Sequence, residues 1–449
     1  MMTEQTNTPR FCDNLLFLNV FKTFRIAVQP ARLFTAFLAV IIIFAAGWLM
    51  DFTKTVVVSS QLTSRDLRMS RLTSSVTYPT ELHCFIGAPD RVESFITNYK
   101  DRPNAEKQGV FEVLSGFCMT RFNQMVVSIL TLKFDFAVLA VTESVLALIW
   151  AIKYHAVYTV IFLAFSLLVI TVAGGAICRG AAMQFSKDQI PGITPCLKFS
   201  LKKFVSLFCA LIAPAILVAS LGYVLILLVG LTANIPYAGE IILALLFIWV
   251  LFLGLIIASV VIWALTGGTL MFGAMGYESS DSFDIICKTF IYLRTKPWQF
   301  ILYSAAAAVY GAICYLFVRF VTFLTLVVSR YFLGVIMWTD ASQAQTIGKL
   351  DAMWSEPEFF NLTGAVPNIV RTGTESIGAF VINLEILAVA GIVLAAAMSF
   401  YFSANSIIYC LLRKKADNVS LDEVFVEAQP PVQPEAQAVE EIAQPQQPE

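Results

Sequence analysis

The sequence predicts an all-α polytopic membrane protein, with about six transmembrane helices in parallel helix-pair repeats and a small extracytoplasmic α+β domain. Hydrophobic residues make up 58% of the chain and charged residues only 14%. Several uncharged runs exceed the roughly 18–20 residues that cross a bilayer as a helix. A soluble protein could not bury so much apolar surface. The net charge of −1 argues against a nucleic-acid partner.

An internal repeat organises the apolar runs. Residues 174–188 read GGAICRGAAMQFSKD, and residues 267–281 read GGTLMFGAMGYESSD. Both copies place Gly-Gly, Gly-Ala and Ser-x-Asp at the same spacing, at the end of a long apolar run. Small residues let membrane helices approach closely, and the packing glycines predicted in this way are Gly174, Gly175, Gly180, Gly267, Gly268 and Gly273. Ser and Asp favour helix N-caps, and the predicted caps are Ser186, Asp188, Ser279 and Asp281.

The two ends of the chain resemble a third, split copy of the repeat. Lys22-Thr23-Phe24 precedes the first apolar run, as Lys288-Thr289-Phe290 precedes a later one. Ser420-Leu421-Asp422 follows the last run, as Ser279-Ser280-Asp281 follows the second copy. Three helix pairs arranged in this way would bring the two termini together on one face of the membrane.

Hydropathy and charge together predict the order of the segments. This order is a cytoplasmic N-terminal interfacial segment at 1–32, a span at 33–50, an extracytoplasmic domain at 51–136, an interfacial or re-entrant helix at 137–155, helix pairs at 156–232 and 241–328, an extracytoplasmic segment at 329–377, a span at 378–412 and a cytoplasmic tail at 413–449. The basic residues of the short loops then fall on the cytoplasmic side, as the positive-inside rule requires. We therefore predict a multi-pass inner-membrane protein with both termini in the cytoplasm.

The segment 137–155 is short and carries Glu143 near its centre. Counting it as a full span would move the basic loops and the C-terminal Arg413-Lys414-Lys415 to the outside. An interfacial or re-entrant helix does not cross the membrane, so the loops that follow it stay on the side that the positive-inside rule requires.

The region 51–136 is too long for a plain loop and is expected to fold. β-Branched content and alternation predict strands over 53–63 and 74–87. A helix is predicted from Pro89 to Lys100, and residues 109–133 show helical spacing of apolar residues.

Cysteine and histidine use gives little sign of special chemistry. Cys84 and Cys118 are the only cysteines in the two predicted outside regions. Two interpretations stay open: a disulfide formed in an oxidising periplasm, or two buried thiols. Only two histidines are present, so neither a metal site nor a cofactor is predicted.

Ionisable residues within predicted spans are candidates for function, because the bilayer disfavours them. Arg319, Glu385, Glu240 and Glu143 all fall at similar expected depths. We predict an ion pair between Arg319 and either Glu385 or Glu240. Such a pair would lock helices together, or it would act as a gate or as a contact for an anionic ligand.

The stretch 278–311, together with GGAICRGAAMQF at 174–185 and NIPYAGE at 234–240, resembles a family of uncharacterised multi-pass membrane proteins of planctomycete-type bacteria. The resemblance covers most of residues 150–330. It implies a location and a fold, and it implies no activity.

The sequence favours an integral membrane protein without catalytic activity that organises or supports an envelope membrane complex. No nucleotide-binding, hydrolase or metalloprotease motif appears in a supporting context. The expected partners are the lipid bilayer and other membrane or envelope proteins, bound through the outside domain or the tail. The tail at 413–449 is expected to be disordered from its Pro, Gln and Glu content, either as a solvating or as a docking segment. The alternative function is a permease or channel subunit for a small solute, with Arg319 as an intramembrane charge.

Overall fold

The computed structural model describes residues 11–58, 78–100, 107–236, 238–337, 348–364 and 373–425. Eight of its helices are long and apolar enough to cross a membrane. They are α2 (Pro30–Met50), α6 (Val110–Leu130), α7 (Phe134–Tyr154), α8 (Ala156–Lys187), α10 (Phe204–Leu225), α12 (Gly239–Glu278), α14 (Pro297–Ile336) and α16 (Gly373–Asp417). The chain is therefore a multi-pass helical membrane protein, with two more candidate spans than the sequence predicts.

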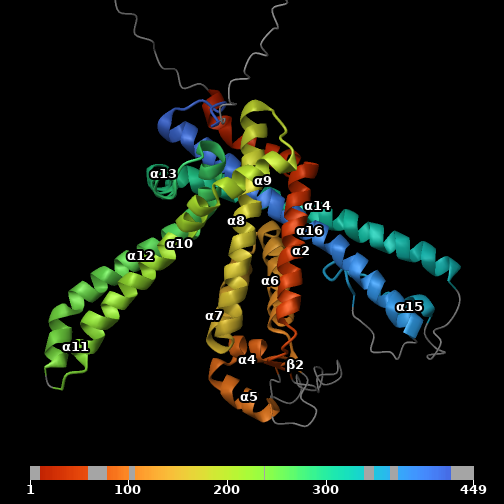
Figure 1. Ribbon diagram of the computed structural model, residues 1–449, viewed down its shortest axis with the longest axis horizontal. Helices are drawn as coiled ribbons and strands as arrows, with labels where there is room; N and C mark the ends of the chain where they lie inside the picture. Colours follow the sequence, from red (N-terminus) through yellow and green to blue (C-terminus); the bar gives the residue numbers. More distant parts are fainter. Residues whose placement is uncertain are drawn as a thin grey trace, which may run out of the picture.

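The long helices form three arms that separate from one end of the molecule (Figure 1). The central arm contains α2, α6, α7 and α8. The second arm pairs α10 with α12 and the third pairs α14 with α16. In space, α10 therefore packs mainly on α12, and it makes fewer contacts with α8, its predicted partner in the first helix pair.

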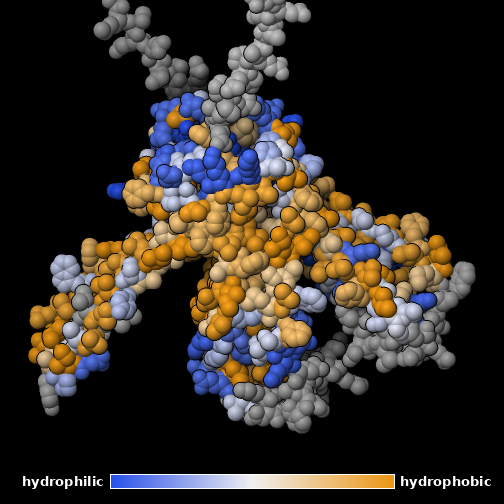
Figure 2. Space-filling model, in the orientation of Figure 1, coloured by the Kyte–Doolittle hydropathy of each residue, from blue (hydrophilic) through white to orange (hydrophobic). Residues whose placement is uncertain are grey.

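Several arm helices are longer than a bilayer is thick. Helices α12 and α14 each have 40 residues and α16 has 45. At about 1.5 Å per residue, 40 residues extend about 60 Å, roughly twice the hydrocarbon core. They therefore tilt or continue beyond the membrane. Figure 2 shows the corresponding pattern: an apolar belt along the arms, and polar surface at the end where the arms meet.

Short elements complete the end where the arms meet. They are η1 (Phe11–Lys22), α1 (Thr23–Ala27), α9 (Ile193–Lys202) and α13 (Ser282–Thr295). The tip of the second arm carries the π-helical turn η3 (Ile226–Gly230) and α11 (Leu231–Ala233). In the predicted segment 329–377, residues up to Ile336 extend α14, Lys349–Met353 form α15, and residues from Gly373 begin α16.

Helices α6 and α7 form a hairpin where the sequence predicts one interfacial or re-entrant helix at 137–155. The Asp51 carboxylate, just after α2, accepts hydrogen bonds from the Phe111 and Glu112 amides at 3.0 and 2.9 Å. This contact satisfies free amides at the α6 N-terminus and fixes it beside the end of α2. Both helices are long and apolar enough to cross a membrane, whereas the sequence predicts only helical spacing at 109–133 and an interfacial or re-entrant helix at 137–155. Because the hairpin adds two helices, an even number of crossings, the basic loops that follow it stay on the cytoplasmic side that the charge distribution predicts.

The segment around the hairpin's base is more helical than predicted. Strand β1 (Val56–Val57) pairs antiparallel with β2 (Lys107–Gln108), but residues 81–87 form helix α4 instead of a strand. The Thr80 hydroxyl accepts a hydrogen bond from the His83 amide, and this N-cap outweighs the β-branched content before it. The helix predicted from Pro89 to Lys100 is confirmed as η2 (Pro89–Arg91) followed by α5 (Val92–Lys100).

The start of the predicted tail belongs to the folded core. Helix α16 continues to Asp417, and the segment 418–425 turns back across the polar end of the molecule. Its Phe425 amide donates to the Tyr277 carbonyl at 2.8 Å, while Leu421 and Val424 pack on the main hydrophobic cluster. The prediction of disorder is therefore wrong for residues 413–425. Residues 426–449 lie outside the described residues.

Candidate functional site at the helix junction

The helix junction is the region where residues 173–186 of α8, 267–278 of α12 and 399–412 of α16 pack together. Most of these residues are buried, and they form the largest hydrophobic cluster of the described chain. A Cβ atom added at Gly276 would lie 3.0 Å from the backbone carbonyl atoms of Cys178. The backbones of α8 and α12 therefore touch, as small residues permit between membrane helices.

The repeated glycines mostly occupy close contacts. Added Cβ atoms at Gly174 and Gly273 would meet the rings of Phe272 and Phe402 and the Tyr409 side chain, all at 2.7 Å. Gly175, Gly180 and Gly267 also have neighbouring side chains within 3.2 Å. Gly268 has no neighbour within 4 Å, so its predicted packing role is wrong. Gly276 was missed because the first copy has Met183 at the matching position.

The Ser-x-Asp residues end helices more than they begin them. Ser186 lies inside α8 and is buried. Asp188 and Ser279 adopt left-handed φ values of 53° and are the C-caps of α8 and α12. Only Asp281 takes an N-cap position, before α13, and its side chain makes no capping hydrogen bond. The predicted N-caps at Ser186, Asp188 and Ser279 are wrong, because the preceding helices continue into this motif.

Two buried arginines connect the junction to its surroundings. Arg32 of α2 donates from Nε to the Ile26 carbonyl at 2.7 Å, and from Nη2 to the Gln184 side chain. Arg179 of α8 donates to the carbonyls of Gly276 at 2.8 Å and of Phe425 at 2.7 Å. Carbonyl and amide oxygens thus satisfy guanidinium groups that burial would otherwise disfavour.

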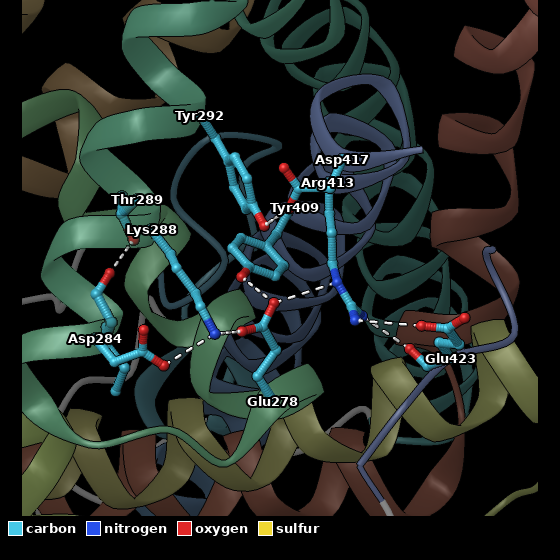
Figure 3. Close-up of polar contacts among 10 residues, drawn as sticks. Glu278, Asp284, Lys288, Thr289, Tyr292, Tyr409, Arg413, Asp417 and Glu423 are labelled. Atoms are coloured by element: carbon cyan, nitrogen blue, oxygen red, sulfur yellow. Dashed lines mark hydrogen bonds and ion pairs between the residues drawn. The ribbon is translucent and has the colours of Figure 1, made fainter. Parts of the chain in front are cut away.

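Glu278, the last residue of α12, is the centre of a polar cluster on the junction (Figure 3). Its Oε1 accepts a hydrogen bond from the Tyr409 hydroxyl at 2.7 Å and lies 3.2 Å from Arg413 Nε. Its Oε2 accepts from Lys288 Nζ, which also lies 2.9 Å from Asp284. The carboxylate therefore joins α12, α13 and α16 at one point.

The charges of this cluster neutralise one another. Hydrogen bonds from Ser280 and Lys288 lower the pKa of Asp284, although burial opposes the shift. Burial disfavours the Lys288 ammonium, but hydrogen bonds to Glu278 and Asp284 outweigh it and raise its pKa. A lysine nucleophile or a general acid needs shifts of the opposite sign. The arrangement suits a structural clamp between helices.

The clamp predicts a measurable loss of stability in Glu278→Gln. Glutamine keeps the shape of the side chain but leaves Arg413 and Lys288 facing a neutral oxygen. We expect a loss of about 1.5–3 kcal/mol, the range for hydrogen bonds to charged groups, measured as thermal unfolding in detergent. Glu423→Gln is the control, because that side chain is 62% exposed and pairs with Arg413 only at 3.8 Å. Equal losses in both variants would contradict the clamp.

The four predicted intramembrane charges do not form one cluster. Arg319 on α14 is 4% exposed. It donates to the Phe359 carbonyl and to the Tyr315 hydroxyl, both at 2.6 Å, and to Asn123 Oδ1 at 3.2 Å. Its predicted ion pair with Glu385 or Glu240 is wrong, because neutral oxygens surround the guanidinium and both carboxylates are exposed on the arms. Glu143 instead pairs with Arg121 inside the α6–α7 hairpin, at 2.7 Å.

The position of Arg319 predicts that it holds α14 against α6. In Arg319→Ala, the Phe359 carbonyl would lose its donor, at a cost of about 1–3 kcal/mol for an unsatisfied buried group. Asn123 would lose one of its two donors and keep the Tyr315 hydroxyl at 2.8 Å. We expect faster maleimide labelling of Cys314, a buried thiol five residues earlier on α14. Peptide mass spectrometry would measure the labelling. Arg330→Ala, which removes a contact with Asp351 at 2.5 Å, is the control and should leave Cys314 protected.

Neither a disulfide nor a metal site is found in the described residues. Cys84 and Cys118 are both free thiols, so of the two interpretations left open by the sequence the structure agrees with the thiols and not with the disulfide. The Cys84 sulfur instead faces the Ala88 carbonyl of its own segment at 4.0 Å, and burial raises the pKa of this thiol. No group of three or more His, Cys, Asp or Glu side chains in the described ranges is placed to hold a metal ion.

No family model, curated protein or solved structure matches this chain. Its function must therefore be argued from the geometry of the junction and of the three arms.

Proposed function

We propose that this protein organises a membrane complex, with the helix junction as a rigid centre and the three arms as docking surfaces for other membrane proteins. The observation that carries the proposal is the separation of the arms. In the most apolar part of α12, no residue of an 18-residue window is buried. Trp249 and Leu255 on this helix are each 65% exposed. Arms that separate in this way present far more apolar surface to neighbours than a closed bundle would.

The arms follow one plan, which supports a threefold form of the internal repeat. In each unit a long helix enters the junction, a short segment lies beside it, and an outgoing helix packs on the long helix of the next unit. The units are α8–α9–α10, α12–α13–α14, and α16 joined across the chain ends with η1–α1–α2. All three entering helices end at a left-handed residue, namely Asp188, Ser279 and Asn418.

The polar junction end belongs on the cytoplasmic side of an inner membrane in this proposal. Both ends of the described chain lie there (Figure 1), together with most of the basic residues of the short loops. These include Lys198, Lys202, Arg294 and Lys296. This orientation obeys the positive-inside rule. The described parts of the segment 51–108, with β1, β2, α4 and α5, then lie outside the cell membrane as a small folded unit.

A permease is the alternative, and the position of Arg319 argues against it. A selective charge must be free to meet a solute, but this guanidinium is buried and donates to three neutral oxygens of its own chain. The charges of the junction are likewise used in contacts between helices.

Native mass spectrometry of the gently extracted protein tests the proposal. We expect stoichiometric membrane-protein partners, copurified through a tag placed before Phe11. A variant with Trp249→Leu and Phe252→Leu keeps the hydropathy of α12 but removes its exposed rings, and it should lose a partner that binds this arm. Phe317→Leu with Phe320→Leu on α14 is the matched control. A lone protein, with solute flux into proteoliposomes that depends on Arg319, would favour the permease.

A further inference from the structure

Glu385 is a single carboxylate on an otherwise apolar face of α16. Between residues 376 and 412 it is the only Asp, Glu, Lys or Arg. Its side chain is exposed, and so are Val381 at 46% and Ile392 at 41% on the same helical face. An ionised carboxylate at such a position is costly in a bilayer unless a cation pairs with it.

The chain itself supplies no such cation in its described part. The described basic residues of α14 in the same arm are Arg319 and Arg330. Arg319 is 4% exposed and faces Asn123 and Phe359, and Arg330 pairs with Asp351 at 2.5 Å. No ion pair of Glu385 occurs among the described residues. The α6–α7 hairpin differs, because there Arg121 neutralises Glu143 at 2.7 Å. One intramembrane carboxylate is thus paired within the chain, and the other is left on the surface.

We propose that this face of α16 binds a transmembrane helix of another protein, and that this helix carries an Arg or Lys at the depth of Glu385. The inference rests on the proposed function and names the chemistry of one partner. An apolar helical stripe with one central anion is complementary to an apolar helix with one cation, in both shape and charge. An arginine would add two parallel hydrogen bonds to the carboxylate.

Photo-crosslinking in native membranes tests this partner. A benzophenone side chain is placed at Val381, one turn from Glu385, and the crosslinked peptide is sequenced by mass spectrometry. We expect a membrane-spanning peptide of another protein, with Arg or Lys within about two helical turns of the crosslink. Glu385→Gln should lower the yield roughly ten-fold, equal to about 1.4 kcal/mol. Glu385→Lys should recover the yield when the partner's cation is changed to Glu.

Glu240→Gln on the other arm is the control, because it removes a carboxylate of α12 and should leave the yield unchanged. Crosslinks only to lipid, only to a second copy of this chain, or to a helix without a cation would overturn the inference. A yield insensitive to Glu385→Gln would do the same. If stoichiometric partners still copurify in those cases, the organising function stands and only the charge pairing fails.

Discussion

Gly276→Ala is expected to destabilise the helix junction, because the added methyl group would press directly on the backbone of α8. The new Cβ would lie 3.0 Å from the carbonyl carbon and oxygen of Cys178, and backbone atoms cannot move aside as a flexible side chain can. Separating α8 from α12 would also lengthen the hydrogen bond from Arg179 to the Gly276 carbonyl. Overpacking of this kind costs about 1–3 kcal/mol, and thermal unfolding in detergent would measure it.

Gly268→Ala is the matched control, because it adds the same methyl group to the same helix. Its Cβ would meet nothing within 4 Å, and alanine raises helix propensity by up to about 1 kcal/mol over glycine. We expect no loss of stability in this variant. If the two variants unfolded at the same temperature, close backbone contact would not be what holds the junction together.

Truncation after Asp417 is expected to loosen the same junction from its surface. The cut removes the Phe425 carbonyl, which accepts from Arg179 at 2.7 Å, and the apolar contacts of Leu421 and Val424. Arg179 would then lose one acceptor while 8% exposed. We expect a loss of roughly 2–4 kcal/mol from the hydrogen bond and the apolar area together.

Truncation after Ala428 is the control for that experiment. It removes most of the Pro- and Gln-rich tail but keeps every contact described for residues 418–425. We expect this shorter chain to unfold like the full chain. A common melting temperature for both truncations and the full chain would show that residues 418–425 do not stabilise the junction.

In this protein the sequence predicts close contacts between helices better than it predicts the partners of polar side chains. Long apolar runs and Gly-Gly motifs report directly on burial and close approach, and five of the six predicted glycines do lie in close contacts. Arg319 shows the limit, because its partners depend on the direction in which α14 leaves the junction. That direction places it beside Asn123, which comes from a segment for which the sequence predicts helical spacing but no membrane span.

Near the ends of helices, the sequence contains conflicting indications of where a helix begins or ends. Residues 81–87 carry strand-like composition, but the Thr80 cap starts a helix there. The Ser-x-Asp motif has good N-cap residues, yet α8 continues through Ser186, because Ser186 is buried within the junction. In the first copy of the repeat, the capping propensity of Ser186 is thus overridden by tertiary burial, which a single sequence does not report.

The order in which the junction is assembled has a consequence for biosynthesis. Phe402, Ser406 and Tyr409 pack against α8 and α12, yet they belong to α16, which the ribosome produces after both of those helices. The first two entering helices are thus inserted long before their common partner exists. Until α16 is inserted, the glycine-lined surface of α8 and α12 that it covers stays exposed in the bilayer. A chain stopped before α16 would keep that surface uncovered, which is the kind of exposed surface that membrane proteases and insertion chaperones recognise.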